Sequence, residues 1–411
     1  MRILWLKTEL LHPVDRGGRI RTYAMLKALR RQHHITYAAL DNRTIPDAQA
    51  LAMEYAHEVV TFPFDAPSRR SMGFALGAIR NLASPLPFTV WRFLSEPMRQ
   101  WVAEADASRR YDVIVCDFLF PAGNLPATRH TPVVLFEHNV EAQIWKRLAE
   151  GASGWRRKYL ELQWRRVARY EAGQCLVMDQ VVTVSVDDSE HIRSQYGALR
   201  VGEVPTGVDT DSIRPSGNIA RERDHLVFLG AMDWLPNEDG AAFLLNDILP
   251  RVRQQRPNVR VTIVGRNPSQ GLRTMAEPIP GVTVTGTVPD VRPYLERASI
   301  MIVPLRIGGG TRLKILEGMA MELPVVSTTV GAEGLPLVPG EHIQLADSPV
   351  DFANAILTLL DDQAGAEALG ARGAAQVRTH HGWDRAAERF SDLCDAATRH
   401  RQHPVSTIAG W

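Results

Sequence analysis

Residues 299–328, SIMIVPLRIGGGTRLKILEGMAMELPVVST, carry a glycine-rich turn between two short apolar runs. The runs at 299–303 and 324–328 are typical of strands buried in a parallel sheet. The segment between them predicts a helix with Thr311 as its N-cap. The apolar side of this helix is made of Leu313, Leu316, Met319 and Ala320. A strand, a glycine turn, a helix and a strand in this order indicate an α/β fold.

The glycines of this stretch suit a phosphorylated ligand. Gly308, Gly309 and Gly310 leave backbone N–H groups bare, and the helix N-terminus at Thr311 adds favourable partial charge for an anion. Three cations flank the turn: Arg306, Arg312 and Lys314. A loose turn beside a solvated basic face is the alternative interpretation. Glu317, inside the helix, favours ligand binding over that alternative.

Composition and charge restrict the class of protein. A chain of 411 residues exceeds one ordinary core and predicts two domains. The 47 Lys and Arg residues balance 46 Asp and Glu residues, so no polyanion, and no nucleic acid, is indicated as a partner. Cys116, Cys175 and Cys394 lack metal-ligand spacing and cannot form a disulfide framework, which fits a reducing cytoplasm.

The N-terminus and the apolar runs bear on location. Residues 1–6 read as a strand with no signal-peptide cleavage site after it. No apolar run approaches the length of about 20 residues that a membrane-spanning helix needs. We therefore expect a cytoplasmic protein that is either soluble or peripheral on the inner membrane.

The first half of the chain alternates strands and helices. A strand at 3–6, a loop with Gly17 and Gly18, and a helix from about 19 to 31 form the unit that opens a doubly wound sheet, although a plain tight turn would give the same pattern. Further strands are expected at 34–40, 57–62, 111–116, 132–137 and 180–185. The strand at 132–137 runs into His138 at the carboxyl edge, where such sheets bind ligands, so His138 is a candidate site residue.

Two stretches of the first half admit two interpretations each. Residues 63–101 mix apolar and basic side chains with little regularity, as in an elaborate loop or in a surface that meets something apolar. Residues 141–172 predict one long helix with many basic residues. That helix either packs through Tyr159, Leu162 and Val167 with a solvated basic face, or meets a membrane surface.

The second half repeats the α/β alternation. A capped helix ending at Gly197 precedes the irregular stretch 204–217, and we expect the domain boundary near residues 203–222. Strands are expected at 225–230, 259–265 and 282–285, and helices at 238–255, 351–360, 366–380 and 383–399.

Seven segments in this order resemble the GT-B glycosyltransferases, and in particular glycosyltransferase family 4. They are DRGGR (15–19), FEHN (136–139), VPTGVD (204–209), FLGAMDWLPN (228–237), VGRNP (264–268), GTVPDVRPYL (286–295) and GGGTRLKILEGMAMELPVV (308–326). The resemblance covers nearly the whole chain and is strongest to bacterial sugar transferases found with exopolysaccharide export systems.

The resemblance implies two Rossmann-like domains facing across a cleft. An N-terminal, acceptor-side domain would span residues 1–203 and a nucleotide-sugar-binding domain residues 204–382, while a final helix within 383–411 returns to the N-terminal domain. The family also implies retaining transfer without a metal or other cofactor, since the nucleotide-diphosphate sugar is a co-substrate.

Site residues follow from matching the family motifs to this chain. Gly17 and Gly18 would lie beside the donor phosphates, His138 would contact the donor sugar, Val288 would present its backbone to the base, and Glu317 would bind the ribose. A carboxylate suits a ribose because it accepts hydrogen bonds from two hydroxyl groups at once.

The leaving diphosphate explains the expected cations. Charge develops on it as the glycosidic bond breaks, so Lys314 with Arg306 or Arg312 would stabilise the transition state more than the ground state. The predicted catalytic residues are His138, Lys314, Arg306 and Glu317. The predicted donor-binding residues are Gly17, Gly18, Val288, Gly308, Gly309, Gly310, Thr311 and Arg312. No Asp-x-Asp pair at a strand end demands a metal.

The chain departs from the family pattern at two places. Family members commonly have a glutamate eight residues before the second one, and here that position is Gly309. They often have an arginine after the first strand of the second domain, and here Ala231 and Met232 follow Gly230. The identity of the donor sugar is therefore open.

The expected activity is hexosyl transfer from a nucleotide-diphosphate sugar to a glycan or polyprenyl-linked acceptor, in exopolysaccharide or cell-envelope synthesis. A nucleotide-sugar 2-epimerase on the same fold and a non-catalytic nucleotide-sugar-binding subunit are the alternatives. A dinucleotide dehydrogenase is disfavoured, because no G-x-G-x-x-G follows the first strand. The inner leaflet of the membrane is a further candidate partner.

Overall fold

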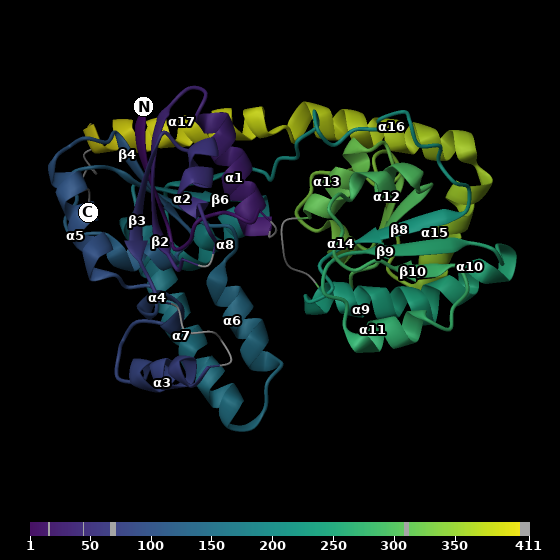
Figure 1. Cartoon of the computed structure of the whole chain (residues 1–411), viewed down its shortest axis with the longest axis horizontal. Helices are drawn as coiled ribbons and strands as arrows, with labels where there is room; N and C mark the ends of the chain where they lie inside the picture. Colours follow the sequence, from purple (N-terminus) through teal and green to yellow (C-terminus); the bar gives the residue numbers. More distant parts are fainter. Residues whose placement is uncertain (15–16, 44, 66–70, 308–311, 403–411) are drawn as a thin grey trace, which may run out of the picture. The chain divides into compact units, whose positions relative to one another are not determined.

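A computed structural model describes residues 1–14, 17–43, 45–65, 71–307 and 312–402. The chain divides into two compact units. The first unit comprises Met1–Pro205 together with the chain from Trp383 onward, and the second comprises Thr206–Gly382. Each unit is an α/β layer structure with its own parallel sheet, which confirms the predicted fold class (Figure 1).

The first unit is built on a parallel sheet in the strand order β3-β2-β1-β4-β5-β6-β7. Its strands are β1 (Arg2–Lys7), β2 (His34–Asp41), β3 (Glu58–Pro63), β4 (Val113–Asp117), β5 (Val133–Phe136), β6 (Gln180–Thr183) and β7 (Val201–Glu203). The central strands are almost wholly apolar because helices cover both faces of the sheet.

Different helices cover the two faces of this sheet. The α-helices of the unit are α1 (Gly17–Leu29), α2 (Ala48–Leu51), α3 (Met72–Asn81), α4 (Phe88–Trp91), α5 (Glu96–Ala107), α6 (Glu141–Glu150), α7 (Gly154–Val177), α8 (Val186–Tyr196) and α17 (Trp383–Gln402), with short 3₁₀ turns η1 (Ala52–Glu54) and η2 (Phe120–Asn124). α1 and α17 pack on one face, where Phe390 meets Trp5 and Phe136. α5, α7 and α8 contribute to the core on the other face. The last helix thus returns to the first unit, as predicted (Figure 1).

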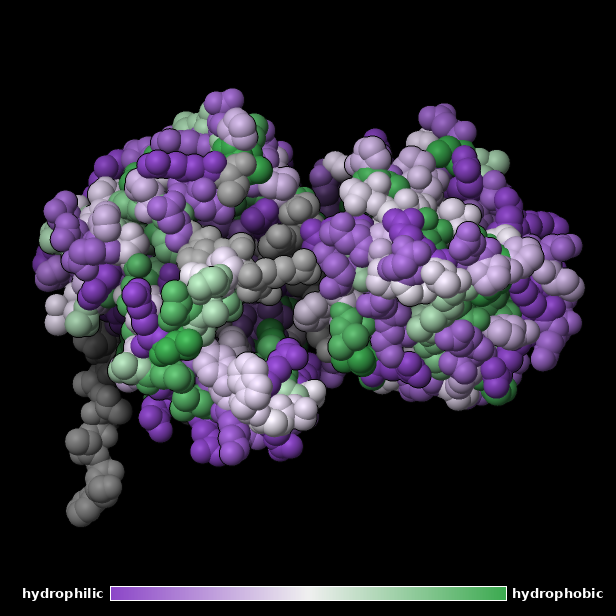
Figure 2. Space-filling model, turned by 60° about the horizontal axis from the view of Figure 1, so that its bottom comes forward, coloured by the Kyte–Doolittle hydropathy of each residue, from purple (hydrophilic) through white to green (hydrophobic). Residues whose placement is uncertain are grey.

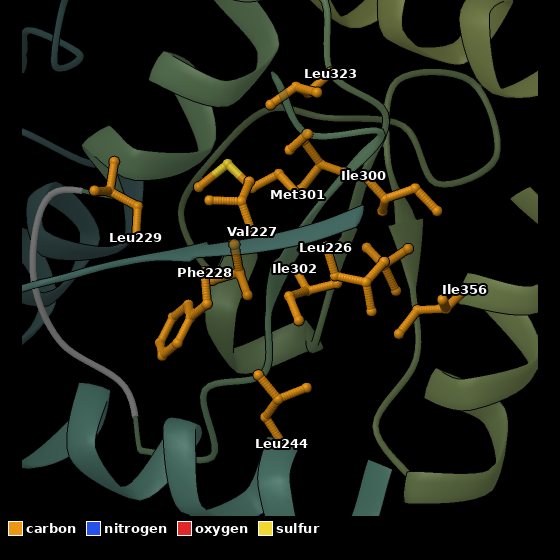
Figure 3. Packing of buried hydrophobic residues seen from close by; sticks show 14 of the residues in the cluster. Leu226, Val227, Phe228, Leu229, Leu244, Ile300, Met301, Ile302, Leu323 and Ile356 are labelled. Atoms are coloured by element: carbon orange, nitrogen blue, oxygen red, sulfur yellow. The ribbon is translucent and has the colours of Figure 1, made fainter. Parts of the chain in front are cut away.

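The second unit has a parallel sheet in the order β10-β9-β8-β11-β12-β13. Its strands are β8 (His225–Leu229), β9 (Arg260–Val264), β10 (Val282–Val284), β11 (Ile300–Val303), β12 (Val325–Ser327) and β13 (Gln344–Leu345). Its helices are α9 (Leu235–Phe243), a π-helical turn η3 (Leu244–Ile248), α10 (Leu249–Gln255), α11 (Gln270–Ala276), α12 (Arg292–Arg297), α13 (Leu313–Ala320), α14 (Thr329–Ala332), α15 (Pro349–Asp361) and α16 (Gln363–His380). Figure 3 shows side chains of β8 and β11 filling the core.

Two expectations about helices are wrong, and a third stretch is more regular than its sequence suggests. Residues 63–101 hold the helices α3 and α4 and the start of α5, so this stretch is no irregular loop, and α3 and α4 pack through an aromatic contact. The single helix expected at 141–172 is two, α6 and α7, because the chain turns at Gly151–Ser153. The helix expected at 238–255 is interrupted by the π-helical turn η3.

The packing expected of α7 is confirmed in part. Val167 is buried against the core, as predicted, whereas Leu162 is exposed and Tyr159 is only half-buried. The cap of α8 is as predicted, with Ser185 accepting from the N–H of Asp188 and Gly197 left-handed at the C-cap. In the part of the chain that the structure describes, no helix is both long and apolar enough to cross a bilayer.

Candidate functional site

The glycine turn before α13 lies outside the described residues. This applies to Gly308, Gly309, Gly310 and Thr311, so their roles stay predictions. The described part begins at Arg312, which occupies the position before the helix in a left-handed conformation, φ 53°. α13 therefore begins at Leu313, one residue later than a cap at Thr311 would place it.

Lys314 points from the first turn of α13 toward Asn237 of α9. Its Nζ lies 2.5 Å from Oδ1 of Asn237 and 5.1 Å from the centre of the Phe228 ring. Asn237 is buried, and its Nδ2 donates to the carbonyl of Ala231 at 2.8 Å. That second bond fixes which way the amide faces, so the oxygen is turned toward the ammonium group.

Gly230 makes room for this amide. A Cβ at position 230 would lie 2.8 to 2.9 Å from the side chain of Asn237, closer than real Cβ contacts come. The glycine of the GAMDWLPN segment and the asparagine at its end therefore act together to hold Lys314.

The environment of Lys314 disfavours its positive charge. Burial, and next the charge of Arg312, lower the pKa of Lys314 to about 7, and Glu317 offsets this only in part. Among the described residues no carboxylate oxygen forms an ion pair with this ammonium group. A cation that is costly to keep without a ligand suits a site that receives an anion.

Glu317 lies one turn after Lys314 on α13. It is half-buried, and burial raises the pKa of its carboxyl to about 6 although Lys314 opposes the shift. In the described ranges its carboxylate has no hydrogen-bond partner, so both oxygens can accept from a ligand.

The two arginines that the sequence groups with Lys314 are already paired. Arg306 forms a forked bond to Asp239, at 3.0 and 2.6 Å, and its guanidinium lies 4.7 Å from the Phe243 ring. Arg312 is buried and bonds to the carboxylate of Glu333 at 3.1 Å. Lys314 is therefore the cation of this group whose charge is least compensated.

Val288 follows β10 and packs, half-buried, against the core of the second unit. Within the described residues neither its N–H nor its carbonyl makes a backbone hydrogen bond. Its main chain can therefore pair with a ligand, and the predicted role toward a base stays a prediction.

In the first unit, Gly17 and Gly18 begin α1. A Cβ on Gly18 would come within 3.1 Å of the Phe118 ring and 3.9 Å of Nδ1 of His138. The second glycine thus lets the start of the helix approach the histidine that follows β5. Sequence reasoning placed both features at this sheet edge.

His138 is held by an acid that the sequence did not single out. Its Nε2 lies 2.8 Å from Oδ1 of Asp117, and its ring stacks on Phe118 with centroids 3.9 Å apart. The other oxygen of Asp117 accepts from Lys7 at 2.8 Å and from Thr22 at 2.7 Å. The side chains of Lys7, Thr22, Asp117 and His138 are all buried.

The charges in this cluster are strongly coupled. Burial alone would raise the pKa of Asp117, but Lys7 and His138 outweigh it, and the pKa lies well below its usual value. Burial lowers the pKa of His138 to about 3, against the pull of Asp117, so the imidazole is neutral near pH 7 and Lys7 balances the carboxylate. Nδ1 of His138 is buried and has no hydrogen-bond partner among the described residues.

Lys7, Asp117 and Asn237 were not among the predicted site residues. Lys7 ends β1 and Asp117 ends β4, so the carboxyl-edge rule applied to His138 also covers them. Asn237 lies in a segment that resembles the family, but the sequence alone does not indicate a role for its side-chain amide. In the residues that the structure describes, no three His, Cys, Asp or Glu side chains gather as metal ligands, and the metal-free mechanism stays a prediction.

Comparison with known proteins gives two family matches. The family model described as "Glycosyltransferase Family 4" matches residues 16–212, and that described as "Glycosyl transferases group 1" matches residues 223–362.

Two curated relatives differ in how much they cover. An "Uncharacterized 44.6 kDa protein in cps region" of Klebsiella pneumoniae is 20% identical over 377 residues, covering 89% of this chain and 92% of the relative. A phosphatidyl-myo-inositol mannosyltransferase of Mycobacterium tuberculosis is 29% identical over 190 residues, covering 43% of this chain and 50% of the relative. The chain thus matches about half of the mannosyltransferase.

Solved structures share the fold over almost the whole chain. Sucrose-phosphate synthase from Thermosynechococcus elongatus superposes with a TM-score of 0.71 at 19% identity, covering 96% of this chain and 98% of that one. Anabaena HepE, in complex with UDP and glucose, has a TM-score of 0.66 at 14% identity, covering 96% and 99%.

Proposed function

Because this chain belongs to the GT-B glycosyltransferases, with family 4 features, we propose that it transfers a hexosyl group from a nucleoside-diphosphate sugar with retention of configuration. The observation that carries the proposal is that Lys314 and Glu317 lie one turn apart at the start of α13. One is a cation held by an amide, and the other is a carboxylate with free oxygens.

The second unit supplies the groups that a nucleoside diphosphate needs. Lys314 would bind the diphosphate and stabilise the charge that develops as the anomeric C–O bond breaks. Glu317 would accept hydrogen bonds from the ribose hydroxyls, and the free backbone of Val288 would pair with the base. The solved structure of HepE, which shares this fold, is a complex with UDP and glucose, and this supports a nucleotide-sugar donor.

The first unit would supply a neutral acceptor of hydrogen bonds. With Asp117 beside Nε2, the proton of His138 resides on that nitrogen, since two lone pairs 2.8 Å apart would repel. Nδ1 is then the acceptor, and a sugar hydroxyl is a suitable donor to it. Gly17 and Gly18 would admit a phosphate near the start of α1.

The proposed acceptor is a glycan or a polyprenyl-linked sugar of the cell envelope. The relative from the cps region and the fold likeness to WaaG, described as involved in lipopolysaccharide biosynthesis, support this role. The enzyme would act in the cytoplasm, where nucleotide sugars and the inner-leaflet carrier meet.

Thermal-shift measurements with UDP, GDP, ADP and TDP sugars test the donor class. A bound donor raises the melting temperature by mass action, and the effective donor should then be hydrolysed slowly without acceptor. The anomeric configuration of the released or transferred sugar, read by NMR, tests retention. Donor binding without hydrolysis or transfer would favour a binding subunit, and an altered configuration at C2 would favour an epimerase.

A further inference from the structure

One face of α3 exposes a stripe of large apolar side chains. Met72, Leu76 and Ile79 are 82%, 51% and 63% exposed, and their spacing of four and three residues puts them on one side of the helix. The opposite side is packed, since the Phe74 ring lies 5.1 Å from that of Phe88. Figure 2 shows hydrophobic side chains gathered over this part of the first unit.

Polar bonds hold α3 to α7 and leave this stripe outward. Nε2 of Gln163 donates to Oδ1 of Asn81 at 2.9 Å, and Arg166 donates to the carbonyls of Asn81 and Leu82 at 2.9 and 3.0 Å. A helix that is fixed at its end by such bonds presents its apolar face as a formed surface. In Figure 1, α3 lies beside α7 on the side of the unit away from α17.

The charges around the stripe are basic. The sequence from residue 66 to residue 95 contains no Asp or Glu. Arg80 on α3 and the exposed Arg156 and Lys158 of α7 have no acidic partner among the described residues, whereas Arg157 pairs with Glu161 at 2.8 Å. Trp155, 83% exposed, begins the same turn of α7.

We propose that the apolar stripe of α3, with the basic first turn of α7, docks on an anionic lipid bilayer. Apolar side chains enter the acyl boundary while cations remain at the headgroups, and an exposed tryptophan suits the same level. This inference goes beyond the proposed sugar transfer and does not depend on it.

A second copy of the chain fits this surface less well. The stripe spans one helix of ten residues, about 15 Å long, and covers far less than the roughly 800 Å² per partner of a stable interface. Uncompensated cations on both copies would also repel each other. A bilayer needs neither a large matched surface nor an acidic protein partner.

Flotation of the full-length protein with vesicles of neutral lipid, and with vesicles containing about 30% phosphatidylglycerol, tests the proposal. The variant Met72→Gln/Leu76→Gln/Ile79→Gln removes the stripe but keeps residues that favour helix. We expect its partitioning on anionic vesicles to fall about tenfold or more. The matched control is Leu199→Gln, because Leu199 is 95% exposed outside α3.

A charge variant and a single variant complete the test. Arg156→Gln/Lys158→Gln should weaken binding several-fold at low salt and less at high salt. Leu76→Gln alone should reduce it several-fold, which keeps the test valid if the triple variant fails to fold. Thermal shift by nucleotide sugars should be unchanged in all variants, so a failure here is distinct from a failure of the proposed function.

Three results would overturn the proposal. One is equal partitioning of the wild-type protein and the triple variant. Another is absence of binding to anionic vesicles. The third is a wild-type dimer in solution that the triple variant abolishes, since a second copy of the chain would then occupy the stripe.

Discussion

Replacing Lys314 by methionine should stabilise the ligand-free protein at mildly acidic pH. The ammonium is half-buried beside an aromatic ring and an amide oxygen, and it has no carboxylate partner in the described part of the chain. Methionine has a similar length and favours helix, so it can occupy the same space without the charge. The charge is costly in the empty site and useful only when an anion is bound.

The magnitude follows from the pKa of Lys314. A pKa lowered from its ordinary 10.5 to about 7 corresponds to at most ~5 kcal/mol of lost stability, at about 1.4 kcal/mol for each pKa unit. Because the group is only half-buried, and because methionine gives up the hydrogen bond to Asn237, the net gain at pH 6 should be about 1–2 kcal/mol. For a unit of the size of Thr206–Gly382 the melting temperature should rise by about 3–6 °C.

The stability gained by Lys314→Met depends on pH between the folded-state and the unfolded-state pKa of Lys314. Below a pH of about 7, Lys314 is charged in both the folded and unfolded states, and the folded state bears the full cost. Between about 7 and 10.5 the folded state has lost the proton while the unfolded state keeps it, so the cost falls as pH rises. The gain from Lys314→Met should therefore shrink by roughly half between pH 6 and pH 9.

Differential scanning calorimetry without ligand, at both pH values, measures this gain. Lys158→Met is the control, because Lys158 is exposed on α7 and should shift the melting temperature little. Added UDP should stabilise the wild-type protein more than the variant. A Lys314→Met protein that is no more stable than the wild type at pH 6, or whose gain is the same at pH 9, would refute the reasoning.

Four further predictions concern activity and the buried acid. Glu317→Ala should weaken donor binding by about 2–3 kcal/mol with an unchanged melting temperature, and calorimetric titration showing wild-type affinity would remove Glu317 from the site. Asp117→Asn should cost about 3–5 kcal/mol of stability, because Lys7 loses its buried carboxylate; a denaturant midpoint close to that of the wild type would contradict this. Lys314→Ala should lower kcat more than Arg306→Ala does, since Arg306 is neutralised by Asp239; the reverse order in steady-state assays would move the diphosphate role to Arg306. Turnover should persist in excess EDTA, and complete loss on chelation would count against a metal-free mechanism.

Local sequence features were sufficient to predict the α/β architecture. Apolar β-branched runs are buried in parallel sheets whichever strand they pair with, so β5 and β11 could be located within one or two residues. Side chains that bond to their own helix end, as Ser185 does, make a boundary visible without tertiary information. Lys314, Glu317 and His138 could be named because each follows a strand or turn with a recognisable pattern.

Tertiary packing determined the helix boundaries that hydrophobic periodicity in the sequence does not predict. The short helices α3 and α4 are stable only through their contacts, because an isolated helix of such length is marginal in water. The break between α6 and α7 lets the two helices pack against each other, which no local propensity requires.

The partners of the site residues were also beyond the sequence. Lys7 meets Asp117 across 110 residues, and Asn237 meets Lys314 across 77. Such pairs depend on strand order and on which helix covers which strand, whereas sequence patterns report only on neighbours along the chain. The residue types at the site could therefore be predicted from the sequence. Their protonation states, their charge partners and the orientation of their side chains depend on burial among groups that are distant in the sequence.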